Sequence, residues 1–182
     1  GVLDLEGWDT GLIAPTLVPH DKKFRSTSCL DFDYDADAKC PQWLSFLNST
    51  FEDDAEKIRL LRQWMGYLLV YDYRWQKMML MAGKSRSGKG VITNVVVKGL
   101  VGADGYSGAS LSSLAGDFGL ESMQHAKVAV IGDAHHGVRD RINRAKEILL
   151  NVTGNDQVPV NRKNKGEITC QIPARIMMLA NE

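Results

Sequence analysis

The chain has 182 residues, of which 44% are hydrophobic and 24% charged, a composition typical of a globular protein rather than a disordered one. Its formal net charge is zero, so only a local basic patch could indicate a nucleic-acid partner. Every apolar run is shorter than the ~20 residues of a membrane-spanning helix, and no charged-then-apolar leader opens the chain. We therefore expect a protein without a membrane partner. The cysteines lack paired spacing, which argues against zinc and against a disulfide framework and favours a reduced cytoplasmic compartment; they are Cys29, Cys40 and Cys170.

The first 38 residues show no regular hydrophobic period, and we expect them to be irregular. Aspartates alternate with other residues over 31–37, which is reminiscent of a calcium-binding loop. Such a loop needs Gly at its sixth position and Glu at its twelfth, where this chain has Ala36 and Gln42. The segment is therefore interpreted as a solvated linker.

Two amphipathic helices are predicted after this linker. Pro41 suits the first turn of a helix, and apolar residues follow it at helical spacing. Asp53 and Asp54 are suited to cap a second helix, whose apolar stripe runs over 58–69. The aromatic residues of both helices are interpreted as core rather than as a platform for stacking bases. Residues 1–75 are thus predicted to form an irregular and helical domain that precedes the next one.

From residue 76 onward, apolar strands alternate with amphipathic helices. Short apolar runs at 77–82, 127–131 and 175–180 predict buried strands, and helical patterns follow the first two. This alternation predicts an α/β fold in which helices cover both faces of a parallel sheet. We assign it to residues 76–182. The chain stops directly after the third strand, so we expect it to be a fragment that is truncated at its C-terminus.

A glycine-rich loop follows the first predicted strand and precedes a helix. It satisfies the pattern G-x-x-x-x-G-K, whose glycines let backbone N–H groups converge on phosphate oxygens at a helix N-terminus. A turn that carries glycines by chance is the alternative, but the strand–loop–helix context favours a nucleotide site. Lys89 is expected to reach the β- and γ-phosphates of ATP. The residues of the expected site are Gly83, Lys84, Ser85, Arg86, Ser87, Gly88, Lys89, Gly90 and Val91.

The residues expected to handle magnesium depart from the usual pattern. Gly90 stands where Ser or Thr ordinarily binds Mg2+, so either water or Thr93, one turn later, would have to serve. Asp133 ends the second predicted strand, where a carboxylate orients Mg2+ and the attacking water in phosphate-loop ATPases. Asp133 could instead cap a helix. The usual catalytic Glu does not follow it, because residue 134 is Ala.

Three other polar residues lie near the ends of predicted strands. His135 and His136 are adjacent rather than four residues apart, so they would not share one helix face as metal ligands, and we interpret them as surface residues. Asn181, after the third strand, is suited to contact the γ-phosphate or the attacking water.

Residues 158–172 are predicted to form a β-hairpin, because two alternating arms flank a Lys-Asn-Lys-Gly turn. Pro159 confines the first arm to a sheet edge. The turn presents Arg162, Lys163 and Lys165 together in an otherwise neutral protein. These residues predict a DNA contact, and an ordinary solvated loop is the alternative.

Taken in order along the chain, these segments resemble the superfamily 3 helicase domain of phage and plasmid primase-helicases. The loop at 82–90 is similar to a family variant in which Gly follows the lysine. Other segments similar to the helicase domain are 111–120, 130–134, 153–156, 160–163, 172–175 and 181–182. Segments that resemble the helical region preceding this domain are 2–5, 33–35 and 40–43.

The resemblance implies a phosphate-loop NTPase fold of the AAA+-like class and an ATP-dependent DNA helicase or translocase that acts in replication. It implies a homo-oligomer, a hexamer in the full-length protein, that binds ATP and Mg2+ between subunits in the bacterial host cytoplasm. Single-stranded or forked DNA would pass through its channel. In this family pattern Lys89 is the phosphate lysine, Asp133 the metal-site acid, Lys163 the leading hairpin contact and Asn181 the sensor.

The resemblance also implies parts that this chain does not include. The arginine finger and the primase module would lie outside the fragment. The sequence is also compatible with two other functions. One is a nucleotide-binding assembly module without hydrolysis, and the other is a phosphate-loop phosphotransferase such as a nucleotide kinase.

Overall fold

The computed structural model describes residues 2–4, 16–24, 29–70, 73–132 and 139–181. By its internal contacts the chain divides into two compact units, residues 1–39 and residues 40–182. None of the described helices is long and apolar enough to cross a membrane.

The first unit contains little regular structure in its described part. Strands β1 (Val2–Asp4) and β2 (Thr16–Val18) pair antiparallel, and the short 3-10 helix η2 spans Lys22–Phe24. The sequence predicted an irregular segment here. The strand pair is too short for the alternation of apolar residues to reveal it.

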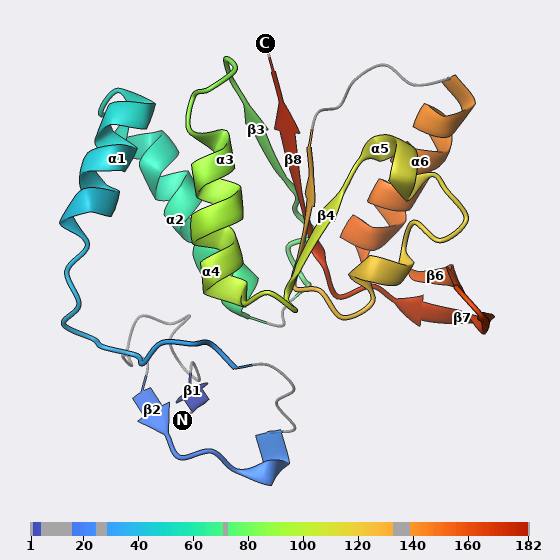
Figure 1. Cartoon of the computed structure of the whole chain (residues 1–182), viewed down its shortest axis with the longest axis horizontal. Helices are drawn as coiled ribbons and strands as arrows, with labels where there is room; N and C mark the ends of the chain where they lie inside the picture. Colours follow the sequence, from blue (N-terminus) through green and yellow to red (C-terminus); the bar gives the residue numbers. More distant parts are fainter. Residues whose placement is uncertain (1, 5–15, 25–28, 71–72, 133–138, 182) are drawn as a thin grey trace. The chain divides into compact units, whose positions relative to one another are not determined.

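The second unit is built around a four-stranded parallel sheet (Figure 1). The strands lie in the order β3-β8-β5-β4, so the last strand of the sequence lies between the first and the third. Parallel neighbours need long crossover connections, and helices supply them here. The predicted runs correspond to β3 (Met79–Ala82), β5 (Val128–Ile131) and β8 (Arg175–Ala180). The fourth strand, β4 (Tyr106–Ala109), has no continuous apolar run and was not predicted.

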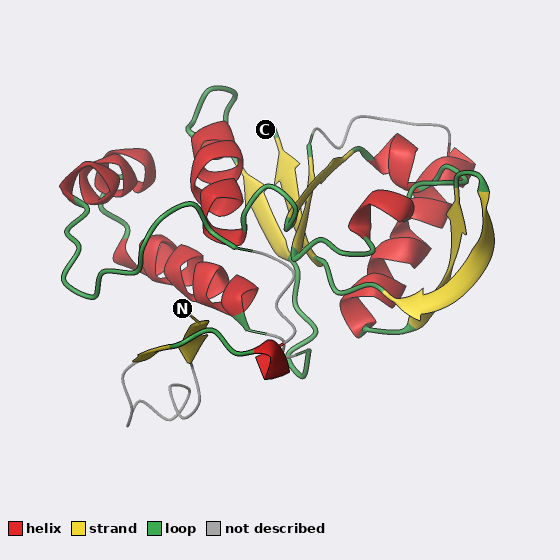
Figure 2. Ribbon diagram, turned by 60° about the horizontal axis from the view of Figure 1, so that its bottom comes forward, coloured by secondary structure: helices red, strands yellow, loops and turns green. Residues whose placement is uncertain are grey.

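Helices cover both faces of this sheet (Figure 2). On one side lie α1 (Pro41–Phe51), α2 (Ala55–Leu69) and a continuous helix over 89–101. This last helix consists of α3 (Lys89–Val91), the π-helical segment η3 (Ile92–Val97) and α4 (Lys98–Val101). On the other side lie α5 (Leu111–Leu114), the 3-10 helix η4 (Glu121–Met123) and α6 (Arg139–Gly154).

Each face of the sheet has its own hydrophobic core, and the central strand β5 supplies both. Val128 and Val130 belong to the core under the first group of helices, whereas Ala129 and Ile131 belong to the other core. This division follows from the alternation of side chains along a strand. The first core also contains Leu47, Leu61, Trp64 and Leu68 of α1 and α2. These two helices, which the sequence placed in the preceding domain, thus share a core with the sheet.

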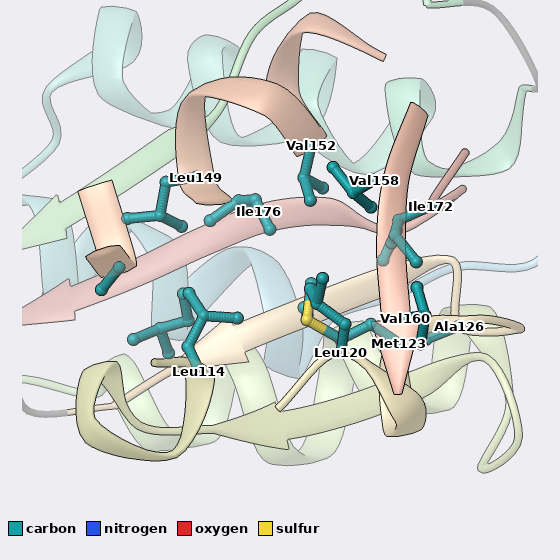
Figure 3. Close-up of a cluster of buried hydrophobic side chains, with 14 of the residues drawn as sticks. Leu114, Leu120, Met123, Ala126, Leu149, Val152, Val158, Val160, Ile172 and Ile176 are labelled. Atoms are coloured by element: carbon teal, nitrogen blue, oxygen red, sulfur yellow. The ribbon is translucent and has the colours of Figure 1, made fainter. Parts of the chain in front are cut away.

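The second core extends to a β-hairpin beside α6 (Figure 3). Strands β6 (Gln157–Arg162) and β7 (Lys165–Gln171) pair antiparallel, with Pro159 opposite Thr169. Val158 and Val160 are buried in this core. An isolated two-stranded hairpin would be only marginally stable. Packing against the second core therefore stabilises this hairpin.

A buried arginine fastens the end of α2 to the sheet. Arg175, the first residue of β8, is only 5% exposed. Its guanidinium lies 3.8 Å from the ring centre of Tyr67 and 5.1 Å from that of Tyr73, and it donates a hydrogen bond to the carbonyl of Val70. Stacking and hydrogen bonding together compensate for the desolvation of this charge.

Helix α2 begins at a charged cap. The Oδ1 atom of Asp54 accepts hydrogen bonds from the backbone N–H groups of Glu56 and Lys57, each at 3.1 Å, and its Oδ2 lies 3.0 Å from the Lys57 ammonium. The pKa of Asp54 lies below its ordinary value of 3.8, and the largest cause is the hydrogen bond that the carboxylate accepts from the backbone N–H of Lys57. The folded state therefore favours the ionised carboxylate.

This cap predicts a pH-dependent stability difference. Asp54→Asn keeps an oxygen that can cap the helix but removes the charge. Because the folded-state pKa of Asp54 is depressed, the charge stabilises the fold above pH 3.8, and this contribution is lost as the pH falls through the lower, folded-state pKa. We expect the variant to melt at a lower temperature at pH 7 and the difference to vanish at low pH. Thermal unfolding over a pH series measures this, with the exposed Asp104→Asn as the control. A difference that persists unchanged at low pH would contradict the charge effect.

Candidate functional site

The ends of three parallel strands form the rim of a small pocket. The loop after β3 is attached to the end of β8, because the backbone N–H of Gly83 donates to the carbonyl of Ala180 at 3.3 Å. The pocket has a volume of about 190 Å³. It is lined by Arg86, Ser87, Gly88, Lys89 and Gly90 after β3, by Gly132 after β5, and by Leu179 and Asn181 at the end of β8. Ligands of open α/β sheets bind at this carboxyl edge. The fold thus brings the glycine-rich loop and Asn181 to one pocket.

The loop has a backbone that favours glycine. Gly88 has a φ of +87°, a left-handed conformation that side chains rarely adopt, and Arg86 has a φ of +62°. A β-carbon at Gly88 would lie only 2.9 Å from the ring atom Cζ of Phe46 and 3.3 Å from Oγ1 of Thr50. Helix α1 therefore packs directly against the loop. The sequence did not reveal this contact, because Phe46 follows a helical spacing that indicates only a core position.

Lys89 is held inside the loop in this structure. Its ammonium donates to the carbonyls of Gly83 at 2.6 Å and Lys84 at 2.8 Å, and it lies 3.4 Å from Oγ of Ser87. The positive charge is thus concentrated at the N-terminal end of the helix over 89–101, where backbone N–H groups lack helical partners. An ammonium and a helix N-terminus at one pocket suit an anionic ligand such as a phosphate group.

The described residues of the pocket offer few ligands to a metal ion. Gly90 has no side-chain oxygen, and no group of three or more His, Cys, Asp or Glu residues gathers anywhere in the described part of the chain. Thr93 is fully buried and its hydroxyl donates to the carbonyl of Lys89 at 3.1 Å, so it does not face the pocket as the sequence allowed. Asp133, with its neighbours His135 and His136, lies outside the described residues.

The basic turn of the hairpin is fastened at two points. The Nε and Nη2 atoms of Arg162 donate to the carbonyl of Gly166 at 3.0 and 2.9 Å, which folds this guanidinium back onto the turn. The backbone N–H of Lys163 lies 3.2 Å from each carboxylate oxygen of Glu121 in η4. The side chains of Lys163 and Lys165 are exposed. Glu121 had no signal in the sequence, since it is 42 residues away from the turn that it supports.

The turn itself is shorter than the sequence predicted. Arg162 pairs with Lys165, which leaves only two residues in the turn, and Asn164 has a φ of +59°. Asn tolerates this conformation better than most residues do. A shift of register between Val160 and Arg162 lets the arms close around so short a turn.

The pocket and the basic turn lie at opposite ends of the sheet (Figure 1). The hairpin joins the end of α6 to the start of β8, whereas the pocket lies where β3, β8 and β5 end. No residue of the turn 162–165 lines the pocket. Substitutions in the pocket and in the turn can be tested independently.

Solved structures with the same fold come from the NrS-1 C-terminal region. Three apo structures of this region align with TM-scores of 0.67, 0.64 and 0.62 and sequence identities of 19%, 18% and 19%. Each alignment covers 79% of this chain but only 33–34% of the other, so the chain spans about a third of their length. At these identities the likeness shows a shared fold.

Sequence families give a more direct assignment. No curated protein sequence matches the chain. Residues 1–52 match the family described as D5 N terminal like. Residues 81–182 match a family of unknown function, DUF5906, and this segment contains the loop, β5, the hairpin and β8. Because the second match covers more than half of the chain's 182 residues, the chain belongs to the DUF5906 family.

Proposed function

We propose that this chain is the nucleotide-binding part of an ATP-driven DNA helicase or translocase of the superfamily 3 class that acts in replication. One observation carries the proposal, namely the pocket in which the glycine-rich loop, Gly132 and Asn181 meet at the carboxyl edge of the sheet. The D5-like match and the fold shared with the NrS-1 C-terminal region support the coarser relationship to phage primase-helicases. For the whole protein we propose ATP hydrolysis, assembly into a ring and a DNA substrate.

In the proposed site, the phosphates of ATP occupy the pocket beside the loop. Lys89 would exchange its contacts with the carbonyls of Gly83 and Lys84 for charged contacts with the β- and γ-phosphate oxygens. The backbone of 83–91 would hold the phosphates, and Asn181 would contact the γ-phosphate or the attacking water. Mg2+, with Asp133 as its proposed ligand, would offset phosphate charge when bound.

In the proposed interface with DNA, the exposed lysines of the hairpin turn contact the phosphate backbone. Lys163 and Lys165 are exposed, and Arg162 stiffens the turn through its contacts with Gly166. Such contacts carry no sequence information, which suits a protein that moves along single-stranded or forked DNA. A hexamer would place several such turns around one strand.

The proposed function first predicts an effect at the phosphate loop. Lys89→Ala should abolish detectable ATP binding, because the variant loses the ammonium that we propose to contact the β- and γ-phosphates. The core cluster contains no part of Lys89, so the fold should persist. Isothermal titration calorimetry measures affinity, and circular dichroism checks the fold. The control is Lys146→Ala, which removes an exposed lysine from α6. Unchanged ATP affinity in the Lys89 variant would remove the nucleotide site from consideration.

A second prediction concerns the hairpin. Lys163→Ala and Lys165→Ala should each weaken binding of single-stranded DNA and reduce the slope of log K against log salt by about 0.7, the value for one lost phosphate contact. Arg162→Ala should also weaken binding, partly because the turn loses its contact with Gly166. Fluorescence anisotropy at several salt concentrations measures this, again with Lys146→Ala as the control. ATP affinity should stay the same in all of these variants. DNA binding that does not change would identify the turn as an ordinary surface loop.

A third prediction separates the proposed activity from its two alternatives. We expect ATP hydrolysis by the chain to be slow and to be accelerated by single-stranded or forked DNA. A coupled phosphate-release assay, run with DNA, with small hydroxyl acceptors and with neither, measures this. Turnover that requires a small acceptor would indicate a phosphotransferase. ATP binding without turnover under every condition would favour a nucleotide-binding assembly module.

A further inference from the structure

The face of the helix that begins at the phosphate loop contains an unusual pair of residues. Gly90 and Asn94 are four residues apart, so they lie one above the other on the same face. Gly90 lines the pocket at the strand ends. A β-carbon at position 90 would lie 3.8 Å from the carboxamide nitrogen of Asn94. The carboxamide nitrogen of Asn94 therefore lies within van der Waals contact of the position that a side chain at residue 90 would take.

The carboxamide of Asn94 is oriented by a tyrosine from β4. The hydroxyl of Tyr106 lies 2.9 Å from Oδ1 of Asn94 and donates to it. Burial raises the pKa of Tyr106 above its ordinary value of 10.0, so the phenol keeps its proton at neutral pH. The oxygen of Asn94 is thereby engaged, and the nitrogen lies toward Gly90. No residue in the described part of the chain accepts a hydrogen bond from this nitrogen.

Thr93, the neighbouring polar residue, does not present its hydroxyl to the pocket. Thr93 is fully buried and bonded to the carbonyl of Lys89. Asn94, in contrast, is exposed. Of the two, Asn94 is the residue whose polar group lies beside the open position at Gly90, whereas the Thr93 hydroxyl is bonded to the helix backbone.

We propose that the carboxamide nitrogen of Asn94 donates a hydrogen bond to a phosphate oxygen of the bound nucleotide. The inference rests on the proposed nucleotide site and adds a residue to it. An N–H donor recognises an anionic oxygen and not a cation. A neutral donor from the helix thus holds the phosphate beside position 90, the position at which a hydroxyl ligand of Mg2+ ordinarily stands. As a consequence, the contribution of this position to nucleotide affinity does not require Mg2+.

The effect of removing this donor can be estimated. A hydrogen bond to a charged partner contributes enough that its loss changes an equilibrium constant by about ten- to a hundredfold. Asn94→Ala should thus raise the Kd for ATP by that factor, both with Mg2+ and with EDTA. Asn94→Asp should raise it further in EDTA, because a carboxylate repels phosphate, and Mg2+ should restore part of the affinity.

Further variants make the test specific. Tyr106→Phe removes the hydroxyl that orients Asn94 and should produce a smaller loss of the same kind in both solutions. Gly90→Ser supplies the missing hydroxyl and should increase the dependence of affinity on Mg2+. Asn143→Ala, an exposed asparagine on α6, is the matched control and should bind ATP like the unaltered chain. Circular dichroism and melting temperature verify that each variant is folded.

The experiment is a calorimetric titration of ATP into each variant, with Mg2+ and with EDTA. Equal losses for Asn94→Ala in the two solutions would support the inference. Unchanged affinity for Asn94→Ala, in a chain that binds ATP and loses it on Lys89→Ala, would overturn the inference and leave the proposed nucleotide site intact. A loss confined to the solution with Mg2+ would also overturn it, because Asn94 would then act through the cation. Failure of the unaltered chain to bind ATP in either solution would instead overturn the proposed function.

Discussion

The insertion of β8 between β3 and β5 is the arrangement on which the rest of this structure depends. Its parallel hydrogen bonds with both neighbours bring together three segments that are far apart in the sequence, namely the loop 83–88, Gly132 and Asn181. The same insertion places apolar side chains of β8 in both hydrophobic cores, with Ile176 in one and Met177 in the other. Burial on both faces is what makes a parallel strand of this kind stable. The pocket is thus a consequence of strand order rather than of any local sequence.

The helices before the sheet are part of the same construction. Phe46 packs against Gly88 in the loop, at the carboxyl edge of the sheet, and Arg175 stacks on Tyr67 at the opposite edge. Helix α1 therefore packs near the carboxyl ends of the strands, and α2 packs against the amino end of β8. The phosphate loop does not stand free on its strand, since an aromatic ring limits the conformations of Gly88. Two separate observations explain a glycine at position 88. Its φ is positive, and a β-carbon there would collide with the ring of Phe46.

Two elements connect the pocket with the basic turn. Helix α6 begins after the segment that follows Gly132 and ends at β6, and β8 begins after β7 and ends beside the loop. Both elements contribute to one core, through Leu149, Val152 and Ile176 (Figure 3). Close-packed cores transmit displacements because they contain little free volume. The acceleration of ATP hydrolysis by DNA that we expect would therefore involve α6 and β8, which are covalently joined through the hairpin.

The sequence alone determined the local elements whose physics is local. Apolar runs marked β3, β5 and β8, helical spacing marked α1, α2 and α6, and the motif at 83–89 marked a loop between a strand and a helix. It also allowed the expectation that Asn181 lies near that loop, because parallel strands end at a common edge. It did not reveal β4, whose pattern Tyr-Ser-Gly-Ala lacks an apolar run, nor the short turn around Asn164. Strand order, the contact of Phe46 with Gly88, the support of the hairpin by Glu121 and the position of Asn94 beside Gly90 were decided only by the tertiary structure. The physical reason is that these contacts join residues through side-chain packing and hydrogen bonds in space, and hydrophobic periodicity along the chain contains no information about which segments become neighbours.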